Sequence, residues 1–113
     1  MTAHRVGERW VDICPAADVP LERGVAAIVC GVQVALFRTF DGALFAVGNN
    51  DPFSGANVIA RGIVGTRGDV RTVASPLYKQ VFDLATGVCL DDPAVRLPVF
   101  DLRVRSGRIE VLR

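Results

Sequence analysis

Residues 75–87 read SPLYKQVFDLATG, and this stretch decides how the surrounding chain is interpreted. Residues 80–84 and residues 70–75 contain several β-prone apolar side chains, which is typical of short strands. The Thr86-Gly87 pair that follows favours a turn. We therefore predict two short strands, over residues 70–75 and 80–84, on either side of a loop.

Length and composition limit the class of protein. The chain has 113 residues, enough for one hydrophobic core but too few for a core and a separate catalytic domain. Half of the residues are apolar, mainly Val, Ile and Leu, which favours a compact β-rich fold. We expect residues 1–9 to be a flexible N-terminus and residues 10–113 to form a single domain.

Charge and hydropathy exclude two classes of partner. The formal net charge is +1, and acidic residues are interleaved with the basic ones, which argues against a nucleic-acid-binding surface. No apolar run approaches the roughly 18 residues that a membrane-spanning helix needs, and the N-terminal residues lack the apolar segment of a signal peptide. We expect a soluble, cytoplasmic protein with no membrane partner.

Glycines mark the hairpins of the N-terminal half. Apolar, β-branched runs at residues 25–30 and 32–39 are separated by Gly31, and a third run at residues 43–47 follows Asp41-Gly42. An Asp-Gly pair between such runs is a hairpin signal because both central residues of the tight turn need positive φ. These runs predict a three-stranded antiparallel meander.

The remaining segments also favour strands and loops over helices. Residues 10–14 alternate like a strand, and residues 97–105 and 108–112 predict a second hairpin. Residues 48–71 contain five glycines and predict a long loop, with a short helical turn near residues 56–59. Short strands separated by frequent turns predict a mainly β fold, a small sandwich or barrel.

The spacing of residues 75–87 resembles the cluster-binding loop of Rieske iron–sulfur domains. That loop reads Cys-Pro-x-His-Gly-x-x-Phe-Asp-x-x-x-Gly, and its Cys and His are ligands of a two-iron cluster held by two Cys and two His. Here Ser75 takes the cysteine position and Tyr78 the histidine position. The scaffold positions of the motif are kept by Pro76, Phe82, Asp83 and Gly87. The loop is retained, but the ligands are replaced.

The first half of such a motif, Cys-x-His, corresponds to residues 50–54, which read NDPFS. Asp51 takes the cysteine position and Phe53 the histidine position. Together with segments 33–38, 61–65 and 75–80, this stretch resembles the small subunit of NAD(P)H-dependent assimilatory nitrite reductase, a Rieske-like domain without cluster ligands. The resemblance covers nearly the whole chain.

The resemblance implies a function and a partner. This chain would be an accessory subunit that supports the reduction of nitrite to ammonium in nitrate assimilation and binds no cofactor itself. FAD, an iron–sulfur cluster and sirohaem are expected on the large subunit, which would be the partner. The isolated chain is not expected to be catalytic. Two alternatives are a Rieske-type 2Fe–2S electron-transfer protein and a stand-alone Rieske-like protein-binding module, since fold alone does not fix function.

Residue counting bears on the first alternative. The only histidine is His4, so one chain cannot supply the two histidines of a Rieske centre. Cys14, Cys30 and Cys89 are widely spaced and odd in number, which indicates neither a zinc site nor a disulfide framework. We therefore expect no metal on this chain.

The replaced ligand positions and their neighbours suggest several roles. Phe53 and Tyr78 are expected to fill the space that a cluster would occupy, because an unfilled void costs stability. Lys79, Arg61 and Gln80 are the expected partner contacts. Partner contact is the competing interpretation for Tyr78, and a solvated side chain is the competing interpretation for Lys79 and Arg61.

Catalytic interpretations of the same region are weaker. Asp51 and Asp83 could form a paired-carboxylate site, but an Asp at a turn more often bonds the local backbone. Ser54 and Ser75 lack a neighbouring base. The glycines at 62, 65 and 68 are not followed by the Lys-Ser/Thr of a phosphate-binding loop, so we interpret them as turn glycines.

Overall fold

The computed structural model describes residues 9–113, so the expectation of a flexible segment over residues 1–9 lies, except for Arg9, outside the described residues. Within this range the strands and 3-10 turns are β1 (Trp10–Pro15), η1 (Ala16–Asp18), β2 (Arg23–Val29), β3 (Val32–Arg38), β4 (Leu44–Gly48), η2 (Ile59–Arg61), β5 (Ile63–Arg67), β6 (Val70–Ala74), β7 (Val81–Asp83), β8 (Val99–Phe100), β9 (Leu102–Arg105) and β10 (Arg108–Leu112). The mainly β prediction is confirmed. No helical segment in residues 9–113 has the length and apolar character needed to cross a membrane.

The central sheet has the strand order β2-β3-β4-β8, and its first three strands form the predicted antiparallel meander. Val29 pairs with Val32, so only Cys30 and Gly31 connect β2 to β3. Both connecting residues have positive φ, 50° and 80°, as a two-residue hairpin turn requires. The glycine at position 31 therefore sets the register of this hairpin.

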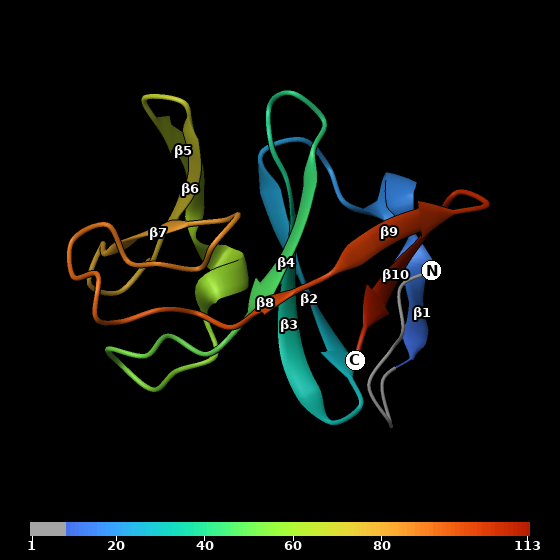
Figure 1. The fold of residues 1–113 in the computed structure, drawn as a ribbon, viewed down its shortest axis with the longest axis horizontal. Coiled ribbons are helices and arrows are strands. Elements are labelled where there is room, and N and C mark those ends of the chain that lie inside the picture. Colours follow the sequence, from blue (N-terminus) through green and yellow to red (C-terminus); the bar gives the residue numbers. More distant parts are fainter. Residues whose placement is uncertain (1–8) are drawn as a thin grey trace.

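Two smaller sheets lie on either side of the central one (Figure 1). One has the order β1-β10-β9, which joins the first described strand to the last, and Ser106 and Gly107 make the predicted β9–β10 hairpin turn. The other has the order β5-β6-β7 and carries the long loops at the opposite end of the molecule. The loops are thereby separated from the paired terminal strands.

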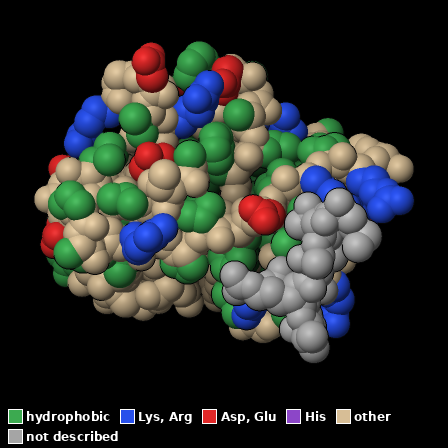
Figure 2. All heavy atoms as spheres, in the orientation of Figure 1, with side chains coloured by type: hydrophobic (Ala, Val, Ile, Leu, Met, Phe, Trp, Pro, Cys, Tyr) green, Lys and Arg blue, Asp and Glu red, His purple; other side chains and the backbone are tan. Residues whose placement is uncertain are grey.

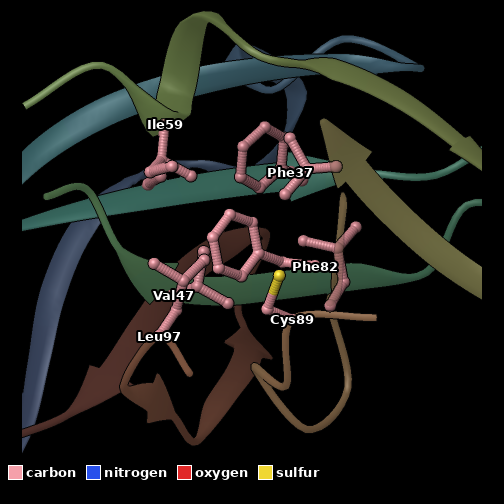
Figure 3. Close-up of a cluster of buried hydrophobic side chains, with 9 residues drawn as sticks. Phe37, Val47, Ile59, Phe82, Cys89 and Leu97 are labelled. Carbon is pink, nitrogen blue, oxygen red and sulfur yellow. The ribbon is translucent and has the colours of Figure 1, made fainter. Parts of the chain in front are cut away.

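Strand β3 is buried on both of its faces, so its alternate side chains belong to two different clusters. The loop-side core consists of Ala35, Phe37, Val47, Ile59, Val73, Phe82, Leu84, Cys89 and Leu97. The terminal-strand core consists of Val19, Val29, Val34, Leu36, Ala46, Ile109 and Val111. Successive side chains of a strand point to opposite faces, which explains why Ala35 and Phe37 enter one cluster and Val34 and Leu36 the other. Figure 3 shows the Phe82 ring in the midst of the loop-side core.

The prediction of a tight turn at Asp41-Gly42 was wrong. Arg38 pairs with Leu44, so residues 39–43 form a longer connection in which Gly42 has φ of 84° and Asp41 does not have positive φ. The Asp41 carboxylate instead accepts a hydrogen bond from the Thr39 hydroxyl at 2.5 Å and pairs with the Arg71 guanidinium of β6. The hydrogen bond between the Thr39 and Asp41 side chains stabilises this longer turn in place of a two-residue turn.

Three other expectations are corrected. Residues 48–71 are not a continuous loop, because β5 and the first residues of β6 lie within it, and the helical turn begins at Ile59 instead of residues 56–59. Residues 97–105 are interrupted at Asp101, because β8 pairs with β4 of the central sheet whereas β9 pairs with β10. The chain changes sheets at this point, which a pattern of alternating residues does not reveal.

Candidate functional site

The candidate site is formed by two loops, residues 49–58 (the first loop) and residues 75–80 (the second loop), which follow β4 and β6. The first loop is anchored at its base by Asn49, which is 2% exposed. Its Nδ2 donates to Gln33 Oε1 at 2.9 Å and its Oδ1 accepts from the Ala60 N–H at 2.7 Å. These bonds fix the start of the loop to β3 and η2.

Asp51 organises the first loop and is fully buried. Its N–H donates to the Ala56 carbonyl at 2.8 Å, its own carbonyl accepts from the Gly55 N–H at 2.7 Å, and Oδ1 accepts from the Phe53 N–H at 2.9 Å. The interpretation of Asp51 as a turn residue that bonds the local backbone is therefore confirmed. One residue supplies the donor and the acceptors that close the loop.

Ser75 organises the second loop in the same manner and is 1% exposed. Its N–H donates to the Gln80 carbonyl at 2.9 Å, and its carbonyl accepts from the Lys79 N–H at 3.1 Å. Its Oγ accepts from the Leu77 N–H at 3.4 Å. Lys79 has φ of 64°, which lets the chain turn back toward β7. The residues between Ser75 and Gln80 project as an exposed tip.

The two buried residues contact each other directly. The Ser75 hydroxyl donates to Asp51 Oδ2 at 2.5 Å, a buried bond between residues 24 positions apart in the chain. These are the two positions that the resemblance aligns with cysteine ligands. Hydrogen bonds to a charged acceptor are shorter and stronger than neutral ones. In place of metal ligands, the two loops have a single hydrogen bond that joins them.

The two positions aligned with histidine ligands differ from each other. The half-buried Phe53 packs against the loop-side core, with its ring centroid 6.2 Å from that of Phe82 and the ring planes tilted by 49°. This agrees with the expectation that Phe53 fills the space. Tyr78 is 60% exposed, so the expectation that it also fills this space was wrong. The tip of the second loop turns its side chain outward.

The residues present do not fit a two-iron cluster held by two Cys and two His. Phe53 has no atom that can ligate iron, and the Ser75 hydroxyl is already donated to Asp51. Cys89 is buried in the loop-side core, Cys14 lies on β1, and Cys30 lies in the β2–β3 turn. No group of three or more His, Cys, Asp or Glu side chains that could hold a metal occurs within residues 9–113.

The catalytic interpretations gain no support from the geometry. Asp83 Oδ1 accepts a hydrogen bond from the Ala85 N–H at 2.8 Å, so the carboxylate stabilises the turn that follows β7. Ser54 Oγ likewise accepts from the Ala56 N–H at 3.1 Å. Gly62 and Gly65 lie in or beside β5, and a Cβ at Gly62 would come within 2.5 Å of the Ala74 carbonyl oxygen. Close approach of the backbone accounts for Gly62, and the positive φ of Gly68, 62°, accounts for the glycine in the β5–β6 turn.

The expected partner contacts lie in three different environments. Lys79 is exposed at the tip of the second loop, and Arg61 is exposed at the end of η2, which packs on β2 and β3. Gln80 is half-buried, and its Oε1 is buried without a hydrogen-bond partner among the described residues. The other arginines of this region are engaged: Arg67 lies 3.7 Å from Asp91, and Arg71 pairs with Asp41.

The sequence interpretation missed Leu77. This side chain is 50% exposed beside Tyr78, so the tip presents an apolar and an aromatic side chain next to Lys79. The sequence could have indicated this exposure, because an apolar residue between a loop proline and a lysine lies in no strand or helix that would bury it. Figure 2 shows several hydrophobic side chains at the surface on the side of the molecule that holds the loops.

Three comparisons with known proteins agree with this geometry. Residues 9–112 match the Rieske-like [2Fe-2S] domain family. The nitrite reductase (NADH) small subunit of Escherichia coli K12 is 36% identical over 104 residues, which is 91% of this chain and 96% of that protein. A crystal structure from Mycobacterium tuberculosis, provisionally assigned as an NADH-dependent nitrite reductase small subunit, is 51% identical with a TM-score of 0.90, covering 94% of this chain and 96% of that one.

A third relative is a larger protein. The nitrite reductase [NAD(P)H] large subunit of Klebsiella oxytoca is 35% identical over 102 residues, which is 90% of this chain but 11% of that protein. A segment similar to most of this chain is thus part of a longer polypeptide there. Taken with the two full-length matches, these similarities identify the chain as a member of the nitrite reductase small subunit family, within the Rieske-like [2Fe-2S] domains.

Proposed function

We propose that this chain is the small accessory subunit of an NAD(P)H-dependent nitrite reductase. The enzyme carries out the six-electron reduction of nitrite to ammonium, and the flavin, the iron–sulfur cluster and the sirohaem that conduct the electrons reside on the large subunit. This chain contributes protein contacts and no redox group. The proposal includes a cytoplasmic location, where the NAD(P)H pool is held, and treats residues 10–113 as one domain.

The functions of the relatives support the identity of the partner. The Escherichia coli relative is named as the small subunit of the NADH enzyme, so a large subunit exists beside it. In Klebsiella oxytoca the similar segment is carried within the large subunit itself. A domain that occurs both as a separate subunit and as part of its partner's chain is expected to function in contact with that partner.

One structural observation carries the proposed role. The positions that would ligate a cluster hold a buried hydrogen bond and a packed Phe ring, while the adjacent tip exposes Leu77 and Tyr78. Exposed apolar and aromatic side chains on a rigid loop are typical of protein interfaces. The loops therefore serve binding in place of electron transfer.

The proposed contact residues follow from this surface. Lys79 and Arg61, both exposed, would meet acidic groups of the large subunit, and Gln80 would gain a partner for its unpaired Oε1. Leu77 and Tyr78 join this set because of their exposure. Charged residues at the rim affect the rate of association more than the affinity, whereas buried aromatic anchors contribute most of the affinity.

The test is nitrite-dependent NADH oxidation by the recombinant large subunit with and without this chain, after elemental analysis of the chain for iron. A rise in activity on adding an iron-free chain is the expected result. Iron in stoichiometric amount would favour the electron-transfer alternative. An iron-free chain that neither binds the large subunit nor changes its activity would favour a stand-alone binding module.

A further inference from the structure

The buried bond between Asp51 and Ser75 is the one side-chain hydrogen bond that joins the first loop, residues 49–58, to the second, residues 75–80. Each loop has its own closed set of bonds, and each set is centred on one of these two residues: Asp51 bonds Ala56, Gly55 and Phe53, and Ser75 bonds Gln80, Lys79 and Leu77. The Ser75 hydroxyl therefore connects two networks that are otherwise local.

We propose that the Asp51–Ser75 hydrogen bond is a clamp that positions the exposed tip of the second loop for docking on the large subunit. Both residues act through the backbone they hold and are positioning residues, since neither reaches the surface. The inference rests on the proposed function for its partner, but the clamp itself is a property of this chain and is testable alone.

Burial gives this bond its strength. A carboxylate that is taken out of water must be compensated by hydrogen bonds, and Asp51 has one from a backbone N–H and one from Ser75. Removing the serine hydroxyl leaves Oδ2 without its donor, which costs more than the net value of an ordinary hydrogen bond. Separating Ser75 from Asp51 would leave a buried carboxylate oxygen without its donor, and this free-energy cost keeps the two loops together.

The aromatic contact between Phe53 and Phe82 supports the same arrangement from the apolar side. Phe53 belongs to the first loop, and Phe82 belongs to β7, which begins just after the second loop. The ring contact holds the first loop against β7, and the second loop cannot separate from the first without leaving the Asp51 carboxylate without its Ser75 donor. Leu77 and Tyr78 are thereby presented in one orientation, which lowers the entropy lost on binding.

The test compares Ser75→Ala with Ser54→Ala, a matched control that makes the same chemical change in the first loop, where the hydroxyl serves only its own loop. Amide hydrogen exchange of Lys79, whose N–H donates to the Ser75 carbonyl and not to the hydroxyl that is removed, is measured by NMR on the isolated chain. We expect S75A to speed exchange by about tenfold or more, the effect of losing a hydrogen bond to a charged group, and S54A to leave it nearly unchanged. Unchanged exchange in S75A would overturn the clamp.

Binding to the large subunit is measured with the same variants. We expect S75A to weaken association severalfold while S54A matches the wild type, and S75T, which keeps the hydroxyl, to bind more tightly than S75A. Faster exchange with unaltered affinity would refute the docking role and leave the clamp intact. Wild-type protein that fails to bind would instead contradict the proposed function. If S75A does not fold, S75C replaces it, since its weaker donor should give intermediate exchange.

Discussion

At the scale of single residues, Phe53 and Tyr78 hold equivalent places in the two loops but lie in opposite environments. The Phe53 N–H is held by Asp51, which directs its ring toward Phe82, whereas Tyr78 sits at the tip of a turn closed by Lys79. The sequence assigned both residues to the same task. The Phe53 ring and the hydrogen-bonded Asp51 and Ser75 side chains occupy the positions aligned with ligands, so Tyr78 remains exposed.

Replacing Phe53 by Ala should destabilise the fold. The half-buried ring contacts Phe82 and the loop-side core, so its loss should lower the free energy of unfolding by about 2–3 kcal/mol, below the range for fully buried Phe. Denaturant titration measures this change. Phe40→Ala is the matched control, because Phe40 is 59% exposed and its loss should cost about 0.5 kcal/mol. Equal effects of the two substitutions would contradict the packed position of Phe53.

Asp41 should make the stability depend on pH. The Arg71 guanidinium and the Thr39 hydroxyl hold the pKa of its carboxyl well below the ordinary value. Because the folded pKa is lowered, the stabilisation is complete above the unfolded pKa, about 4, and is lost as pH falls through the folded value. The gap in Tm between wild type and Asp41→Asn should be small, narrow with added salt, and shrink below about pH 4. A gap that widened in acid would refute this assignment.

At the scale of elements, the turns show what the sequence can specify. Cys30-Gly31 and Ser106-Gly107 are two-residue turns in which the glycine has positive φ, so a single glycine between β-prone runs was sufficient to place both hairpins. Asp41-Gly42 had the same pattern, but bonds from Thr39 and Arg71 to the aspartate favoured a longer loop. These contacts come from outside the pair, which local patterns do not contain.

Strand β5 was missed for a related reason. Ile63, Val64 and Thr66 are strand-prone, but Gly65 in the middle of the segment favoured a loop, and the strand forms where β6 pairs with it from Ile63 to Arg67. For the candidate site, the sequence likewise predicted the positions of the residues but not the contact between them. These positions, including Asp51 and Ser75, followed from the spacing of the motif, but the bond between them depends on how two distant loops meet.

Gly87 should tolerate substitution far less than Gly68, although both have positive φ, 79° and 62°. A Cβ at Gly87 would lie 2.1 Å from the Leu97 carbonyl oxygen, whereas nothing lies within 4 Å of one at Gly68. Gly68→Ala should cost about 1–2 kcal/mol from backbone strain alone. Gly87→Ala should cost more than about 3 kcal/mol or prevent folding, because the backbone must also move. Thermal unfolding compares them, and similar costs would contradict the crowding.

At the scale of the whole molecule, β3 joins the two cores. Its alternate side chains fill the loop-side core and the terminal-strand core, and Ala35, Leu36 and Phe37 are each fully buried. Neither cluster can lose β3 without exposing the other. We therefore expect the two halves to unfold together even though their outer sheets share no strand.

Two local probes test this coupling. Trp10, the sole tryptophan, lies on β1 with the Arg103 guanidinium 4.2 Å from its ring centroid, and it reports on the terminal-strand side. Cys89 is fully buried in the loop-side core, and it becomes the single thiol in a Cys14→Ser, Cys30→Ser variant. Tryptophan fluorescence and thiol labelling should give the same denaturant midpoint. Labelling of Cys89 well before the fluorescence change would show that the loop-side core opens independently.

Strands β1 and β10 pair along their length, and the Arg9 N–H donates to the Arg113 carbonyl while the Arg113 N–H donates to Arg9. The two ends of the described chain therefore leave the molecule side by side, on the side away from the loops (Figure 1). A linker fused at either end would depart from the rear of the domain. Such a linker could join the domain to a much longer polypeptide and leave Leu77 and Tyr78 accessible to the folded remainder of that polypeptide.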